Sequence, residues 1–108
     1  MQVQLETDSN VRGTEELRQR VQSLVEDALG RFGEQITRVE VHLRDENSKK
    51  HGARDKGCTM EARLAGTAPV AVHNNADNML DALQGAANKL EKLLDSRLGR
   101  LHDKDYRA

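Results

Sequence analysis

Apolar and polar residues alternate in four short stretches of the chain, which is the two-residue period of strands with one buried face. The positions between the apolar residues are polar in the first three stretches, whereas Val70 and Val72 alternate with Ala71 and His73. The second stretch, through Val39, Val41 and Leu43, has a wholly polar opposite face, which must look at solvent or a partner. The apolar members are Val3 and Leu5, then Val39, Val41 and Leu43, then Cys58, Met60, Ala62 and Leu64, and finally Val70 and Val72.

Two longer stretches repeat apolar residues every three or four positions, which predicts helices with one buried face. The first follows Thr14, a suitable amino-terminal cap, and ends at Gly33. The second is a helix of about 25 residues, on the order of 37 Å long, whose apolar positions run from Leu80 to Leu101. Its distal turns are therefore expected to extend past a small sheet. Its leucines would also suit a dimeric coiled coil, but the small chain needs them for its own core.

The order of these elements predicts an α+β fold, a two-layer β-α-β-β-β-α arrangement in which both helices pack on one face of a four-stranded sheet. The short turn through 66–69 makes the last two strands antiparallel. Residues 1–102 are expected to form a single domain, with 103–108 as a polar tail. The predicted core contains Leu17, Val21, Leu24, Val41, Leu83, Leu90 and Leu94.

Composition limits the chemistry that such a fold can perform. The 108 residues are 32% charged and 2% aromatic, which leaves a thin aliphatic core and no large buried active-site cavity. The common phosphate-binding, dinucleotide-binding and zinc motifs are absent from the sequence. We therefore expect a protein that is not an enzyme, with no cofactor and no small-molecule substrate.

The single cysteine, Cys58, cannot form an intrachain disulfide and fits a reducing compartment, so the cytoplasm is expected. Its apolar position predicts a buried, inert thiol. No apolar run approaches the ~20 residues needed to span a bilayer, and the first residues do not resemble a signal peptide. The sequence therefore predicts no membrane partner and a mature chain that begins near Met1.

Two histidines, His42 and His73, fall on the polar face of the predicted sheet together with Glu40 and Glu61. Imidazole and carboxylate groups can bind a metal ion. A solvated polar face is the favoured interpretation, and no metal site is predicted.

The formal net charge is only −1, but the charge is unevenly distributed. Residues 45–57 lack large apolar side chains and are expected to form a long mobile loop that concentrates basic groups. Glu91 and Asp95 flank a second set of cations, on the outward face of the last helix, and would partly neutralise them. The candidate nucleic-acid-binding residues are Lys49, Lys50, Arg54 and Lys56 in the loop, and Lys89, Lys92, Arg97 and Arg100 on the helix.

The stretch ADNMLDALQGAANKLEKLLDSRLGRL, together with the element order, resembles the ribosome hibernation-promoting factor family, also called ribosome-associated translation inhibitors or sigma-54 modulation proteins. The strands VEVHL and CTMEARL are similar to the family's middle strands. The resemblance covers about residues 1–102 and is to the short form of the family. The residues that match the family's helix pattern are Met79, Ala82, Leu83, Lys89 and Leu90.

This resemblance implies a protein that binds the small ribosomal subunit and its rRNA, blocks translation under stress and is monomeric off the ribosome. Recognition would rest on shape and phosphate contacts, because the strands lack the aromatic residues that stack on bases. The alternative is a non-catalytic protein–protein interaction module of the same fold, with weak or no ribosome binding. Its partner would bind the mixed-charge sheet face or the overhanging helix, and the near-zero net charge favours it.

Overall fold

The computed structural model describes residues 1–46 and 55–107, with side chains described as far as residue 98. Its element order is β-α-β-β-β-α, with one short 3-10 turn after the first helix, which confirms the predicted fold class. The elements are β1 (Gln2–Thr7), α1 (Glu15–Leu29), η1 (Gly30–Phe32), β2 (Ile36–Asp45), β3 (Lys56–Leu64), β4 (Val70–Ala76) and α2 (Met79–Arg107).

The four strands form one sheet in the order β1-β2-β3-β4. β1 and β2 are parallel, which requires a crossover connection, and α1 supplies it. The other two pairs are antiparallel. The register places Leu5 opposite Val41, Val41 opposite Met60 and Met60 opposite Val72, so one apolar row crosses the whole sheet.

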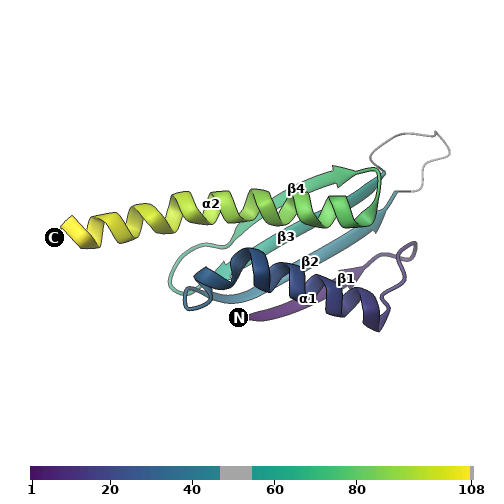
Figure 1. Ribbon diagram of the computed structural model, residues 1–108, viewed down its shortest axis with the longest axis horizontal. Coiled ribbons are helices and arrows are strands. Elements are labelled where there is room, and N and C mark those ends of the chain that lie inside the picture. The colour runs from purple at the N-terminus through teal and green to yellow at the C-terminus, as the bar shows by residue number, and fades with distance from the viewer. Residues whose placement is uncertain (47–54, 108) are drawn as a thin grey trace.

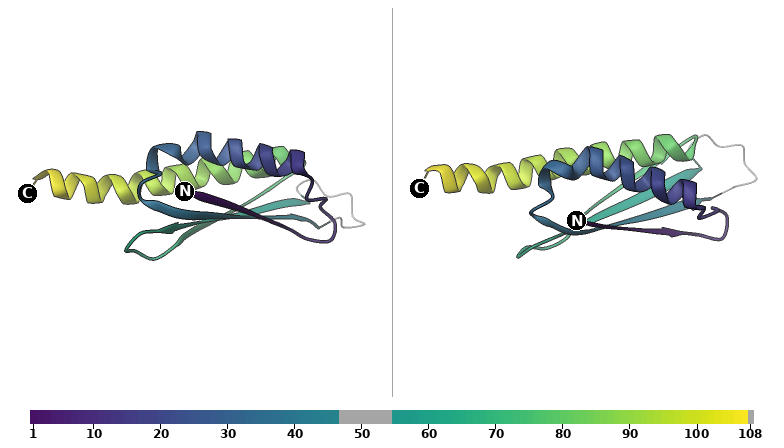
Figure 2. Two further views of the ribbon diagram at one scale, coloured as in Figure 1. Left: turned by 90° about the horizontal axis from the view of Figure 1, so that it is seen from below. Right: turned by 60° about the horizontal axis from the view of Figure 1, so that its bottom comes forward.

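Both helices cover the same face of the sheet and leave the other face bare, as Figures 1 and 2 show. Five of the seven predicted core residues are buried between the layers, namely Val21, Val41, Leu83, Leu90 and Leu94. Leu17 and Leu24 are only partly buried at the margin of the core, so their prediction as core residues is corrected. They lie on the side of α1 that faces α2 rather than on the side that faces the sheet.

Local interactions explain where the helices begin. The Thr14 hydroxyl accepts a hydrogen bond from the Leu17 backbone N–H at 3.1 Å, as the sequence predicts for an amino-terminal cap. At the start of α2, the Asn78 side-chain oxygen accepts from the Asp81 N–H at 2.8 Å. α2 then continues to Arg107, so residues 103–107, which the sequence suggests as a tail, belong to the helix. Figure 1 shows α2 extending well beyond the sheet.

The second and third strands are longer than their apolar residues indicate. β2 continues to Asp45 and β3 begins at Lys56, so Lys56 and Gly57 lie in a strand and not in the predicted loop. Lys56 Nζ lies 2.9 Å from Asp45 Oδ1, and this cross-strand ion pair extends the ladder past the last apolar pair. The remaining loop prediction, including its mobility, concerns residues 47–54, which lie outside the described residues.

A close approach of strand and helix seats α2 on β4. The Asn74 side-chain amide donates to the Ala82 carbonyl oxygen at 3.2 Å. A Cβ atom at Gly85 would overlap this same amide, so glycine at that position lets the helix lie close to the strand. Neither helix in the described part of the chain is long and apolar enough to cross a bilayer.

Replacing Leu90 by Ala should lower the free energy of unfolding by about 2 to 5 kcal/mol, because the change leaves a cavity in a closed core. The matched control is Leu93→Ala on the same helix, since the Leu93 side chain is 37% exposed and should lose much less. Denaturant titration measures both. Equal losses would contradict the orientation of α2.

Cys58 is fully buried, as its position in the pattern predicts, and burial raises the pKa of its thiol to about 12. We expect a thiol reagent near pH 8 to leave the folded protein unmodified and to react at once when denaturant is added, because the thiolate is the reactive form. Mass spectrometry of the treated protein measures the modification. Rapid labelling of the folded chain would contradict this burial.

Candidate nucleic-acid interface

The structure describes the side chains of only some of the eight candidate cations. Lys49, Lys50 and Arg54 lie outside the described residues, and Arg100 is placed only as part of the α2 backbone. The structure therefore places the side chains of four of them, Lys56, Lys89, Lys92 and Arg97.

Lys56 is held in local ion pairs. Its ammonium lies 2.9 Å from Asp45 Oδ1 and 3.3 Å from Asp55 Oδ2. The hydrogen bond with Asp45 is the largest cause that raises the pKa of Lys56, and that with Asp55 acts in the same direction. Two carboxylates already neutralise this cation, so it is a poorer phosphate ligand than its place in the sequence suggests.

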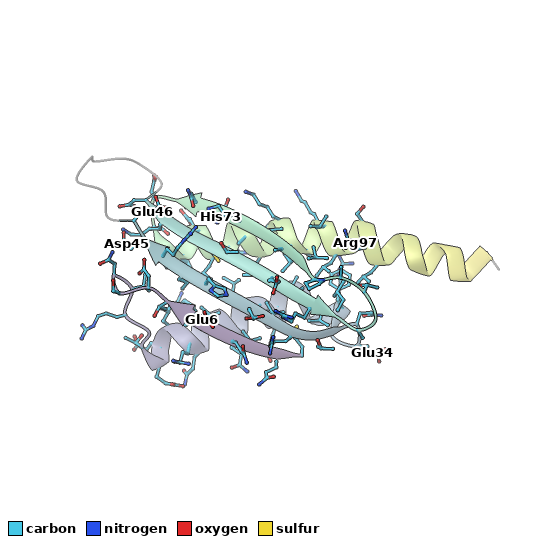
Figure 3. All side chains as sticks on the ribbon, turned by 180° about the vertical axis from the view of Figure 1, so that it is seen from behind. Glu6, Glu34, Asp45, Glu46, His73 and Arg97 are labelled. Carbon is cyan, nitrogen blue, oxygen red and sulfur yellow. The ribbon has the colours of Figure 1, made fainter. Side chains whose placement is uncertain are left out.

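Lys89 lies against the outer edge of the sheet. Its Nζ donates to the His73 carbonyl oxygen on the edge strand β4 at 2.9 Å, so the side chain leans toward the strand and not straight outward. Lys92 and Arg97 are exposed. Figure 3 shows Arg97 where α2 passes beyond the sheet.

The acidic neighbours of these cations are directed away from them. Arg31 in η1 lies 3.4 Å from Asp95 Oδ1 and 4.0 Å from Glu91 Oε1, so the same two carboxylates that would neutralise the α2 cations contact a different arginine. At 100° per residue, Lys89 and Glu91 lie about 160° apart around the helix axis. Lys89 and Arg97 thus lie on a different side of α2 from the nearest carboxylates, whereas Lys92 is only about 60° from Asp95, whose carboxylate contacts Arg31.

The bare sheet face carries a charge network that is balanced near its centre. Glu40 Oε2 accepts from Arg63 Nε at 2.8 Å and from Arg38 at 3.3 Å, and Arg63 also lies 3.4 Å from Glu61. The Arg63 hydrogen bond is the main cause that lowers the pKa of the Glu40 carboxyl, and the charge of Arg38 adds to it. This part of the face is internally paired.

A different arrangement lies at the end of the face nearest residues 47–54. Arg44 on β2 lies 3.5 Å from the Nδ1 atom of His73 on β4, and the Thr59 hydroxyl lies 3.0 Å from the same nitrogen. Gly57 pairs with Arg44 in the register, and a Cβ atom there would lie 3.5 Å from both Arg44 Nη2 and His73 Cε1, so the absence of a side chain leaves these two room to meet. Among the described residues Arg44 has no carboxylate partner within ion-pair distance.

Sequence reasoning missed this contact between Arg44 and His73. Arg44 and His73 are 29 residues apart and on strands that are not adjacent, so only the register of β3 between them brings the two together. The parity of the strands does place both on the polar face, which was the available signal.

The metal alternative loses support from these contacts. The carboxylates of Glu6 and Glu40 and the ring of His42 lie within 4.8 Å of one another on the bare face, and His42 Nδ1 is 3.2 Å from Glu6. Glu40, however, is already engaged by two guanidinium groups. His42 on β2 and His73 on β4 both pair with Thr59 of the intervening strand β3, so the two histidines of the sequence hypothesis are separated by a strand. His73 also lies far from Glu6 on this face (Figure 3).

A profile of the family described as sigma 54 modulation protein / S30EA ribosomal protein matches residues 6–102. The chain belongs to this family. The resemblance inferred from the sequence is thereby confirmed. Members of the S30EA family are ribosome-associated, non-catalytic proteins, so the chain has a ribosome-related role and is not an enzyme.

Two solved structures have a fold similar to that of this chain. The crystal structure of the Thermus thermophilus Protein Y N-terminal domain matches with a TM-score of 0.72 at 18% identity, over 89% of this chain and 98% of that one. A ribosomal subunit interface protein from Coxiella burnetii matches with a TM-score of 0.67 at 20% identity, over 92% and 99%. No curated protein matches the sequence significantly.

The Glu40 network gives a pH prediction. Because the folded-state pKa of Glu40 is lowered, its stabilising contribution is present above the ordinary carboxyl pKa of 4.5 and is lost as the pH falls through the lowered value. Replacing Arg63 by Gln should move the Glu40 titration midpoint upward in an NMR carboxyl titration. Arg18→Gln, an exposed change on α1, is the control and should leave the midpoint in place.

Proposed function

We propose that this protein binds the small ribosomal subunit through contacts between basic side chains and rRNA phosphates, and that binding inhibits translation. A ribosomal partner follows from membership of the S30EA family. The subunit, the rRNA contacts, the inhibition and a monomeric state off the ribosome are parts of the proposal. A ribosomal partner also implies the cytoplasm as the compartment.

The observation that carries the proposal is the separation of charge around α2. Lys89, Lys92 and Arg97 are exposed, while Glu91 and Asp95 contact Arg31 on the side of α2 that faces α1. Phosphate contacts supply most of the affinity of sequence-independent RNA binding, and they need cations that carboxylates do not already neutralise. The β4 side of α2 meets this requirement better than Lys56 of β3 does, because two carboxylates already contact Lys56.

The end of the bare sheet face supports a second group of phosphate contacts. If Thr59 donates its hydroxyl to Nδ1 of His73, the Nε2 atom carries the proton and becomes a donor. Arg44 beside it then adds a fork of donors without a carboxylate partner among the described residues. A phosphate oxygen can accept from both groups at once.

The test compares two triple variants in binding to purified small subunits at several salt concentrations. Changing Lys89, Lys92 and Arg97 to Gln should weaken binding and reduce its salt dependence by about 0.7 to 0.9 per lost contact on a log–log plot. Gln is a comparable helix former, so the helix should remain intact. In vitro translation should be inhibited correspondingly less.

The matched control removes three exposed cations from the α1 side, with Arg12, Arg18 and Arg20 changed to Gln. It alters the net charge equally, so it should retain a steeper salt slope than the α2 variant. If both variants bind as the parent does, with the same slope, the α2 cations are only a solvated surface. The protein–protein interaction module of the same fold would then be the better hypothesis.

A further inference from the structure

An open groove lies between α1 and α2 on the side of the molecule away from the sheet. Its volume is about 1230 Å³, and residues of both helices from Thr14 to Ala28 and from Leu80 to Glu91 line it. Figure 1 shows that the two helices are closest near the end of α1 and are wider apart toward their amino-terminal ends. Arg31, with its contacts to Glu91 and Asp95, closes the narrow end.

The floor of the groove is apolar and incompletely covered. Leu17, Leu24 and Ala28 of α1 pack against the core with one side and remain partly exposed on the other. Leu80 of α2 is 44% exposed, the largest exposure of any leucine in the described side chains. These side chains are spaced along the groove as anchors for a second apolar surface.

The rim of the groove is acidic. Four carboxylates line it, those of Glu16, Asp27, Asp81 and Glu91, against a single cation, Arg20. Glu91 already contacts Arg31 at 4.0 Å. The residues of α2 that line the groove include no lysine or arginine, so no cation of α2 faces Glu16 and Asp27 across it. Such a surface repels phosphate, which excludes it from the proposed RNA interface.

We propose that this groove binds a basic amphipathic helix of a protein partner. An apolar floor takes residues at i, i+3, i+4 and i+7 of a docked helix, and the carboxylate rim pairs with its lysines and arginines. The 15 residues of α1 give the groove a length of about 22 Å, which accommodates roughly four turns of a partner helix.

The site is physically separate from the phosphate contacts proposed above. Lys89 leans toward β4, whereas Glu91 faces Arg31 across the other side of α2. A partner helix in the groove therefore leaves the β4 side of α2 uncovered, and the two kinds of partner can be bound together. The proposal also stands without RNA binding, because it depends on different residues.

The experiment uses the full chain and a synthetic 14-residue peptide with Leu at helical spacing on one face and Lys on the other. A second peptide carries Glu in place of Lys. We expect NMR amide shifts on adding the Lys peptide to cluster at the groove residues of α1 and α2, and the Glu peptide to cause none. Shifts centred on the bare sheet face, or equal binding of both peptides, would overturn the proposal.

Two charge-reversal variants separate specific docking from general attraction. Glu16→Lys with Asp27→Lys changes the rim and should weaken the Lys peptide at least tenfold by calorimetry. Glu15→Lys with Glu26→Lys makes the same change of net charge on exposed positions of α1 outside the groove and should weaken it less than threefold. Equal losses of affinity in the two variants would show that net charge alone attracts the peptide, and would overturn the proposal that it docks in the groove.

The same comparison made with Gln in place of Lys guards against misfolding, since Gln keeps helix propensity and introduces no repulsion. Thermal midpoints of all four variants check that the fold is intact. An RNA occupant is the remaining alternative. The variant with Glu16→Lys and Asp27→Lys is therefore also tested for binding to small subunits. If its affinity rises above that of the parent and the amide shifts on binding fall at the groove, the occupant is RNA and the proposal fails.

Discussion

One constraint governs this molecule, namely that every large apolar side chain of the sheet lies on a single face. The row from Leu5 through Val41 and Met60 to Val72 crosses all four strands, and a one-residue slip in any pairing would turn its members toward solvent. Both helices must therefore lie on the same side, and α1 crosses from one parallel strand to the next there. The opposite face carries charged residues that form ion pairs with one another, such as those of Glu40 with Arg38 and Arg63.

Periodicity was sufficient to predict the order of elements, the two-layer arrangement and the burial of residues such as Val21, Leu83 and Leu90, because these depend on the alternation of apolar positions alone. It failed where polar residues extend regular structure. Asp45 and Lys56 continue a ladder through an ion pair, and residues 103–107 continue a helix without an apolar signal. Leu17 and Leu24 fit the helical stripe, yet the spacing of α1 and α2 leaves them half-exposed, and that spacing depends on tertiary packing.

The candidate site was harder to predict for a related reason. A charge run identifies cations but not their partners, so Lys56 was counted as available although two carboxylates hold it. Glu91 and Asp95 were expected to neutralise the α2 cations. In the structure both carboxylates contact Arg31, some sixty residues earlier in the chain. Arg44 and His73 meet only across an intervening strand whose register the sequence does not reveal. In each case the decisive neighbour is distant in sequence, and only the folded arrangement identifies it.

The arrangement of charge around α2 bears on how quickly such a protein finds its target. With a formal net charge of −1, the chain is not drawn as a whole toward a polyanion. Lys89 nevertheless leans toward β4 while Asp81 and Glu91 line the helix groove, so charges of opposite sign lie on two sides of α2. In the field of a polyanion such a charge separation experiences a torque, so the proposed rRNA contact would favour approach with the positive side of α2 forward. Orientation during approach, rather than bulk attraction, then sets the fraction of productive collisions.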